Sequence, residues 1–170
     1  VKELIASGAL VSDDIVTAMV DSRLSKSDAL EKGVMLDGYP RTVAQAESLT
    51  EILKKHGYET GVAVLVDTPR EILMQRLTGR RLCSNKECGA SFNVFTAPPA
   101  KEGVCDKCGS PLIQRADDTE ETAINRLHIY DTQTAPVIEY YKNRGELKVS
   151  PNCDAPIEEN YTTLAKILGL

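Results

Sequence analysis

The stretch VMLDGYPRT, residues 34–42, decides the expected fold. Its apolar run Val34–Leu36 predicts a buried strand, and a turn through glycine and proline follows at once. Open α/β sheets bind ligands in the crevice beyond the carboxyl ends of their strands. We therefore expect Asp37 to reach a metal ion or its waters and Arg41 to bind a phosphate. Ordinary turn chemistry explains the glycine and the proline, but not the charged residues on either side.

Helices and apolar runs alternate around this stretch. Residues 1–8 are expected to be the end of a helix, and a second helix is capped at Ser12 with Ile15, Met19 and Val20 on one face. A helix over about residues 42–56 then ends at Gly57 and is followed by a strand over residues 62–66. The next helix begins with a capping box at residues 68–71 and runs to about Thr78. Such alternation predicts an α/β fold, in which helices flank a parallel sheet.

The periodicity is lost between Cys83 and about Asp118, where Gly, Pro and Cys are frequent, and this predicts an inserted module. After it we expect a helix capped by residues 117–121 that carries Ile124, Leu127 and Tyr130, a helix over residues 135–143, a strand over residues 147–149 and a helix over residues 156–168.

Composition bounds the class of protein. The 170 residues are 42% apolar and 26% charged, and the formal net charge is −5. This describes one globular domain with an insert and disfavours a general binder of nucleic acid. No apolar run approaches the roughly 18–20 residues that span a bilayer, and no secretory signal pattern opens the sequence. We therefore expect a cytoplasmic protein without nucleic-acid or membrane partners.

Four of the five cysteines form two close pairs, Cys83 with Cys88 and Cys105 with Cys108. Two such pairs bring four thiolates to the corners of a tetrahedron, which suits Zn²⁺. Because all four corners are protein ligands, the zinc is expected to be structural. The alternative is four ordinary buried thiols. We expect Cys153 to be a small buried apolar residue.

Arginines gather at both ends of the insert. Of nine in the chain, Arg76, Arg80 and Arg81 precede it and Arg115 and Arg126 follow it. Arg76 and Arg80 are four residues apart, so one helical face can present both. In an acidic protein this placement indicates phosphate binding. The alternative is a solvated helix end and ordinary ion pairs with the neighbouring aspartates.

Two features are not expected to carry chemistry. His56 and His128 lack partners at ligand spacing and are interpreted as surface or helix-end residues. Gly33 and Gly38 have the spacing that begins a phosphate-binding P-loop, but Tyr39 and Pro40 follow where the motif requires Lys and Ser or Thr.

Taken together, these motifs resemble the adenylate kinases, in the zinc-containing bacterial form with a long lid, over essentially all 170 residues. The resemblance implies a P-loop-type nucleoside monophosphate kinase fold with an inserted zinc-ribbon lid. It implies a monomer that transfers a phosphoryl group reversibly from ATP to AMP with Mg²⁺ and forms two ADP. The implied domains are residues 1–12 as the end of the AMP-binding segment, 13–78 as the first part of the core, 79–118 as the lid and 119–170 as the second part of the core.

The resemblance also implies site residues. Those near AMP are Ala9, Leu10, Val11, Gly38, Tyr39, Pro40, Arg41, Gln45, Arg115 and Arg126, with Arg41 on the phosphate and Gln45 on the adenine. Those near ATP are Arg76, Arg80, Ser91, Phe92 and Ala155. The catalytic set is Asp37, Arg41, Arg80, Arg115 and Arg126, and the zinc ligands are Cys83, Cys88, Cys105 and Cys108.

The sequence departs from the family pattern in two ways. Four residues separate Cys83 from Cys88 where the family usually has two. The family also begins with a strand, a P-loop and its lysine, which these residues do not contain, and we interpret the sequence as an adenylate kinase without that N-terminal segment. The alternatives are another nucleoside monophosphate kinase, using UMP, CMP or a GTP donor, and an inactive fragment or zinc-binding module. Gln45 and the long lid argue against the pyrimidine enzymes.

Overall fold

The computed structural model describes residues 11–59, 61–151 and 155–170. These residues form two compact units. The first unit contains residues 11–67 and 128–170, and the second contains residues 68–127. The expected helix end over residues 1–8 lies outside the described residues, and the domain boundaries inferred from the resemblance stay a prediction.

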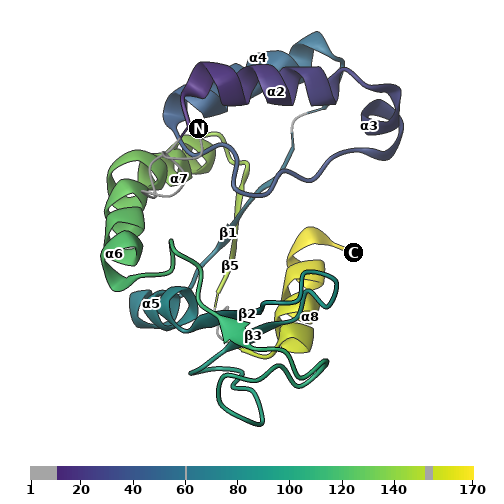
Figure 1. Ribbon diagram of the computed structural model, residues 1–170. Coiled ribbons are helices and arrows are strands. Elements are labelled where there is room, and N and C mark those ends of the chain that lie inside the picture. The colour runs from purple at the N-terminus through teal and green to yellow at the C-terminus, as the bar shows by residue number, and fades with distance from the viewer. Residues whose placement is uncertain (1–10, 60, 152–154) are drawn as a thin grey trace. The chain divides into compact units, whose positions relative to one another are not determined.

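The first unit combines a short parallel sheet with helices (Figure 1). Its elements are α2 (Asp13–Leu24), α3 (Ser27–Lys32), α4 (Val43–Lys55), β1 (Ala63–Val66), the π-helix η1 (Tyr130–Thr134), α7 (Ala135–Asn143), β5 (Leu147–Ser150) and α8 (Ile157–Leu168). Strands β1 and β5 pair in parallel, with Ala63 opposite Leu147. The parallel pairing confirms the α/β prediction, and the bounds of α7 are those that the sequence predicted.

The core of this unit lies between α2 and α4, which run side by side in Figure 1. Leu24, Leu49 and Ile52 are buried there, and Val20 packs against them. Helix α4 begins as predicted, because the Thr42 hydroxyl accepts a hydrogen bond from the Gln45 backbone N–H and caps the first turn.

The face predicted for α2 was only partly right. Val20 packs against the core, whereas the side chains of Ile15 and Met19 are exposed. The buried residue of α2 is Leu24, which lies four residues beyond Val20 on the same side of the helix.

Two further local predictions in this part of the chain were wrong. Residues 34–36 are not a strand, because none of the described residues forms a ladder with them, and Met35 is 92% exposed. Helix α5 (Arg70–Thr78) has Pro69 rather than Thr68 as its N-cap. A capping box therefore does not form, since Pro69 is extended and has no side-chain acceptor. Helix α3 was not predicted.

The second unit contains the insert and two helices. Its elements are α5, β2 (Arg80–Cys83), β3 (Ser91–Asn93), β4 (Leu112–Ile113) and most of α6 (Glu120–Ile129). The three strands form an antiparallel sheet in the order β3-β2-β4, as expected of an insert rather than another βα unit. Helix α6 is capped by Thr119, whose hydroxyl accepts from the Thr122 N–H.

Helix α6 differs from its prediction in the residues that it carries. Tyr130 lies in η1 rather than in α6, and Ile124 is 56% exposed. Its one buried residue is Ala123. Among the described residues, no helix is long and apolar enough to cross a bilayer.

Candidate functional site

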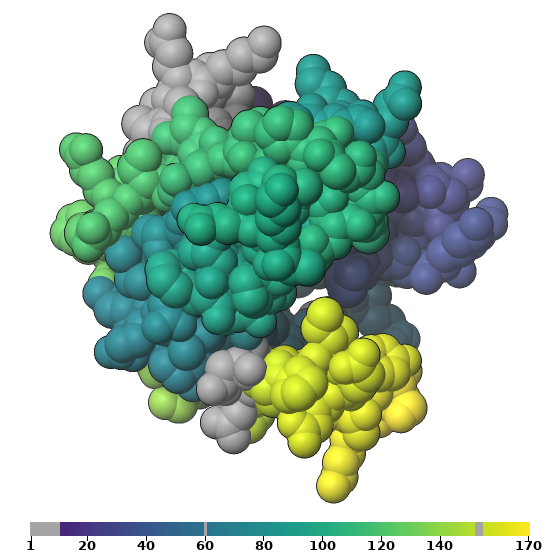
Figure 2. Space-filling view, turned by 60° about the horizontal axis from the view of Figure 1, so that its bottom comes forward, coloured from purple at the N-terminus to yellow at the C-terminus, as the bar shows by residue number. Residues whose placement is uncertain are grey.

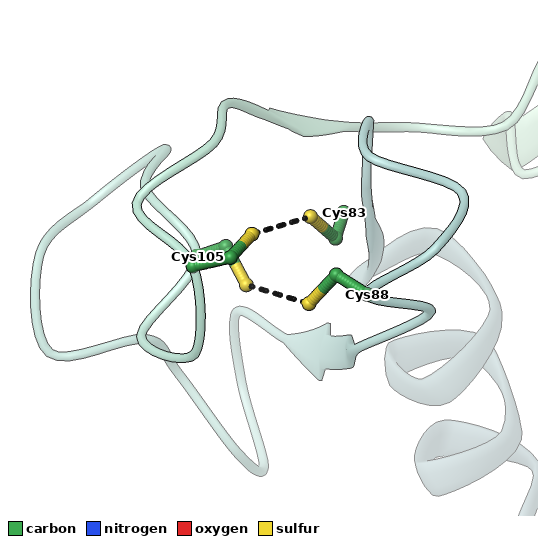
Figure 3. A group of neighbouring side chains, drawn as sticks. Cys83, Cys88 and Cys105 are labelled. Carbon is green, nitrogen blue, oxygen red and sulfur yellow. Dashed lines mark hydrogen bonds between the residues drawn. The ribbon is translucent and has the colours of Figure 1, made fainter.

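The four paired cysteines converge in the second unit. Cys83 ends β2, Cys88 and Cys108 lie in turns, and Cys105 lies in a loop. The Sγ atoms of Cys83 and Cys108 are 3.4 Å apart, and those of Cys88 and Cys105 are 3.7 Å apart. Figure 3 shows the three labelled side chains, Cys83, Cys88 and Cys105, pointing toward one another.

This geometry fits a tetrahedral ion. All four sulfur atoms lie within 4.8 Å of one another, and a tetrahedron with Zn–S bonds of about 2.3 Å has edges of about 3.8 Å. Burial raises the pKa of the Cys83 thiol to about 12. Hydrogen bonds from the Ser110 side chain and backbone lower the pKa of the Cys108 thiol to about 6. A cation is therefore needed to hold all four as thiolates.

The loop between residues 37 and 42 holds Arg41 beside Gln45. The Arg41 backbone N–H donates to Gln45 Oε1 at 2.7 Å, and the Arg41 Nε donates to the Gly38 carbonyl at 2.7 Å. Gly38 has φ +68°, and a Cβ there would lie 2.8 Å from the Arg41 guanidinium. Glycine thus lets the arginine fold back over the turn. Asp37 is exposed, and so is Arg41.

The Gln45 side chain is bonded at both ends. Its Nε2 donates to Asp13 Oδ1 at 2.7 Å, while its Oε1 accepts from Arg41. The Thr42 hydroxyl donates to Asp13 Oδ2 at 2.8 Å. Gln45 is only 3% exposed, so these contacts fix its amide. Sequence reasoning missed Asp13, which lies 32 residues from Gln45.

Two buried aspartates of the second unit form ion pairs with three of the predicted arginines. Figure 2 shows the surface of this unit in teal to green. Asp117 accepts from Arg115 at 2.7 Å and from Arg126 at 2.5 Å. Asp118, which is fully buried, accepts two hydrogen bonds from Arg80. These are the ion pairs that the sequence offered as the alternative to phosphate binding.

The electrostatics follow from these pairs. Burial alone raises the pKa of Asp117, but hydrogen bonds from Arg126 and Arg115 outweigh it, and the pKa lies below its usual range. The hydrogen bond to Asp118 raises the pKa of Arg80. The side chains of Arg80, Arg115 and Arg126 each stay partly exposed.

The predicted pairing of Arg76 and Arg80 on one helical face was wrong. Helix α5 ends at Thr78, so Arg76 is helical whereas Arg80 begins strand β2. The spacing of four residues places two side chains together only while the helix continues. Arg81 instead donates to the backbone carbonyls of Thr78 and Arg80.

The remaining predicted residues are scattered. Ser91 is exposed on β3, Phe92 packs against the cysteine cluster, and the Ala155 carbonyl accepts from the Asn160 amide at 2.8 Å. Val11, Tyr39 and Pro40 are half-buried in the first unit. Ala9, Leu10 and Cys153 lie outside the described residues.

The histidines lie where the sequence placed them. His56 is the C-cap of α4, and its Nε2 lies 2.6 Å from Asp21 Oδ1. His128 is exposed on α6. Asp21, which also accepts from Lys55 at 2.8 Å, was not singled out from the sequence.

Comparison with known proteins decides the family. Residues 1–146 match the family described as adenylate kinase. The chain belongs to the adenylate kinase family. It is 49% identical over 169 residues to an adenylate kinase of Caldicellulosiruptor bescii, which covers 99% of this chain and 77% of that relative. Identity is 46% over 168 residues to that of a Geobacillus species and 44% over 168 residues to that of Thermoanaerobacter pseudethanolicus, each covering 99% of this chain and 76% of the relative.

Membership in the adenylate kinase family confirms two expectations. The fold class is that of the P-loop-type nucleoside monophosphate kinases, and the protein is a phosphotransferase of that class. The four neighbouring cysteines are compatible with the zinc-containing lid that the sequence suggested.

Proposed function

We propose that this protein transfers a phosphoryl group reversibly from Mg²⁺-bound ATP to AMP and forms two ADP. The observation that carries the proposal is the loop from Asp37 to Gln45, in a chain that belongs to the adenylate kinase family. Among the described contacts no carboxylate pairs with the Arg41 guanidinium, which leaves its charge for an anion. In the proposal Arg41 binds the AMP phosphate and Gln45 the adenine.

The three arginines of the second unit neutralise the transferring phosphoryl group. Phosphoryl transfer needs alignment and charge compensation more than covalent chemistry from the protein. Arg80, Arg115 and Arg126 are each held by a buried carboxylate, which leaves further N–H donors on each guanidinium for phosphate oxygens. The remaining proposed ATP contacts are Arg76, Ser91, Phe92 and Ala155, and those to AMP include Ala9, Leu10, Val11, Gly38, Tyr39 and Pro40.

Metal ions have separate roles in this proposal. Zn²⁺ bound by Cys83, Cys88, Cys105 and Cys108 stiffens the lid and has no open position for a reactant. Mg²⁺ arrives with ATP and neutralises phosphate charge, and Asp37 contacts its waters. Closure of the lid brings the arginines to the phosphates and excludes water, which suppresses simple ATP hydrolysis. The protein acts as a cytoplasmic monomer.

The test is ADP formation from ATP, AMP and Mg²⁺, with CMP and UMP as alternative acceptors. Of the three acceptors, we expect only AMP to support activity. Activity with CMP or UMP instead indicates another nucleoside monophosphate kinase, and no ADP from any acceptor contradicts the proposal.

An arginine variant tests the mechanism. Arg126→Ala should lower kcat by about 10²–10³ without changing the circular dichroism spectrum. Arg23→Ala is the matched control, because Arg23 also pairs with an aspartate, Asp28 at 2.7 Å, but lies in α2 outside the proposed site. Equal turnover in the two variants overturns the role of Arg126.

A further inference from the structure

Asp13, at the first position of α2, bonds to the two side chains that begin α4. Its Oδ1 accepts from Gln45 Nε2 at 2.7 Å and its Oδ2 accepts from Thr42 Oγ1 at 2.8 Å. Thr42 is the N-cap of α4 and Gln45 its third residue, an arrangement close to a capping box. In a capping box the Gln side chain returns to the backbone N–H of the cap itself. Here Gln45 bonds one residue earlier, to Arg41.

This arrangement fixes which end of the Gln45 amide points where. Reversing the amide would place its NH₂ group against the Arg41 N–H and its oxygen against the Asp13 carboxylate, so both contacts would become repulsive. Reversal would also lose a hydrogen bond to a charged carboxylate, which contributes more than a bond between neutral groups. The described contacts use one lone pair of Oε1 and one N–H of Nε2, which leaves one acceptor and one donor in a set order.

We propose that Asp13 is a positioning residue that selects 6-aminopurine over 6-oxopurine nucleotides by fixing the Gln45 amide. A 6-aminopurine presents an N–H donor at its exocyclic nitrogen and an acceptor at the adjacent ring nitrogen. A 6-oxopurine presents the reverse pattern, and its two polar groups would meet like groups on the fixed amide. The inference rests on the proposed contact between Gln45 and the acceptor base.

Binding measurements test this without relying on turnover. Titration calorimetry with AMP and with inosine monophosphate gives the ratio of the two dissociation constants. Loss of a hydrogen bond to a charged group is worth about tenfold or more in affinity. We expect Asp13→Ala to weaken AMP binding about tenfold, to change inosine monophosphate binding less than about twofold, and thus to lower the selectivity about tenfold.

Two variants separate positioning from general stability. Asp13→Asn keeps an oxygen that accepts from Gln45, while its new NH₂ group can donate to the Thr42 hydroxyl, and the variant should retain most of the selectivity. Asp14→Ala removes a neighbouring acidic side chain from the same first turn of α2, and should leave the ratio unchanged. Equal weakening of both nucleotides by Asp13→Ala identifies a structural role and overturns the inference.

Gln45→Ala distinguishes failure of this inference from failure of its premise. If Gln45→Ala lowers the selectivity and Asp13→Ala does not, the base contact stands and the role of Asp13 is refuted. If Gln45→Ala leaves the selectivity unchanged, the base contact itself is refuted, and the role of Asp13 with it. Absence of AMP binding by the unmutated protein overturns the proposed function as well.

Discussion

Removal of zinc should unfold residues 80–113 and leave the first unit intact. The buried apolar cluster of this segment consists of Cys83, Ala90 and Cys105, with Cys88, Phe92 and Leu112 packed against it. Three of these six residues are proposed metal ligands. The three strands contain only 4, 3 and 2 residues, so the ladder adds little structure that can persist alone.

The magnitudes favour the metal as the main source of order. Apart from its cysteines and Ala90, the cluster contains only two apolar side chains, Phe92 and Leu112, and both are half-buried. Full burial of such a side chain contributes about 1.5–3 kcal/mol, which is an upper bound for each here. Structural zinc contributes about 10–16 kcal/mol in small zinc modules. The ion therefore outweighs the apolar packing of the segment.

Hydrogen exchange followed by mass spectrometry measures this segment by segment. After chelation, amides of residues 80–113 should exchange much faster, those of α4 should not change, and added zinc should reverse the effect. Cys105→Ser, at a residue that is 1% exposed, should reproduce the loss with zinc present. The exposed Ser84→Ala is the control. Unchanged protection of residues 80–113 in protein shown to contain no metal would refute the reasoning.

Three other perturbations have definite outcomes. Gly79→Ala should destabilise the protein by about 1–3 kcal/mol, measured by urea titration. Its new Cβ would lie 2.5 Å from a side-chain oxygen and 2.6 Å from a backbone carbonyl oxygen. The control is Gly61→Ala, whose Cβ meets nothing within 4 Å and which should leave the stability unchanged. Leu24→Ala, at a residue that is 0% exposed, should cost about 2–5 kcal/mol and exposed Leu30→Ala less than about 0.5 kcal/mol; equal costs contradict the assigned core. The lowered pKa of Asp117 means that its contribution to stability is present above the unfolded pKa, about 3.9, and is lost as the pH falls through the lower folded pKa. Asp117→Asn should therefore reduce the loss of stability on acidification below about pH 4, measured as urea midpoints against pH.

Local signals predicted most of the elements. Five predicted elements agree with the structure to within one or two residues at each end: the helices over residues 42–56, 135–143 and 156–168 and the strands over residues 62–66 and 147–149. Each has a cap, a terminator or an apolar run within its own segment. Residues 34–36 have an equally apolar run but form no strand, because a strand also requires a hydrogen-bonding partner.

The site was predictable only where a sequence motif marks its residues. The spacing of the cysteines predicted a cluster, and the sulfur distances agree with it. The bond from Asp13 to Gln45 crosses 32 residues, and no periodicity or motif indicates it. Arg80 was misplaced because its spacing of four residues from Arg76 was interpreted as helical, although the predicted helix, like α5, ends at Thr78.

The ion pairs of the arginines and their proposed binding of phosphate are compatible rather than competing interpretations. Arg126 donates to Asp117 through Nη2 in the described contacts, and a guanidinium has five N–H donors. A carboxylate that holds one edge of the guanidinium limits its rotation and leaves the other donors for phosphate oxygens. Since Arg126 and Arg115 share Asp117, their charges are held close together at one buried acceptor. In a chain with a net charge of −5, such local pairing is how positive charge is concentrated without a basic surface overall.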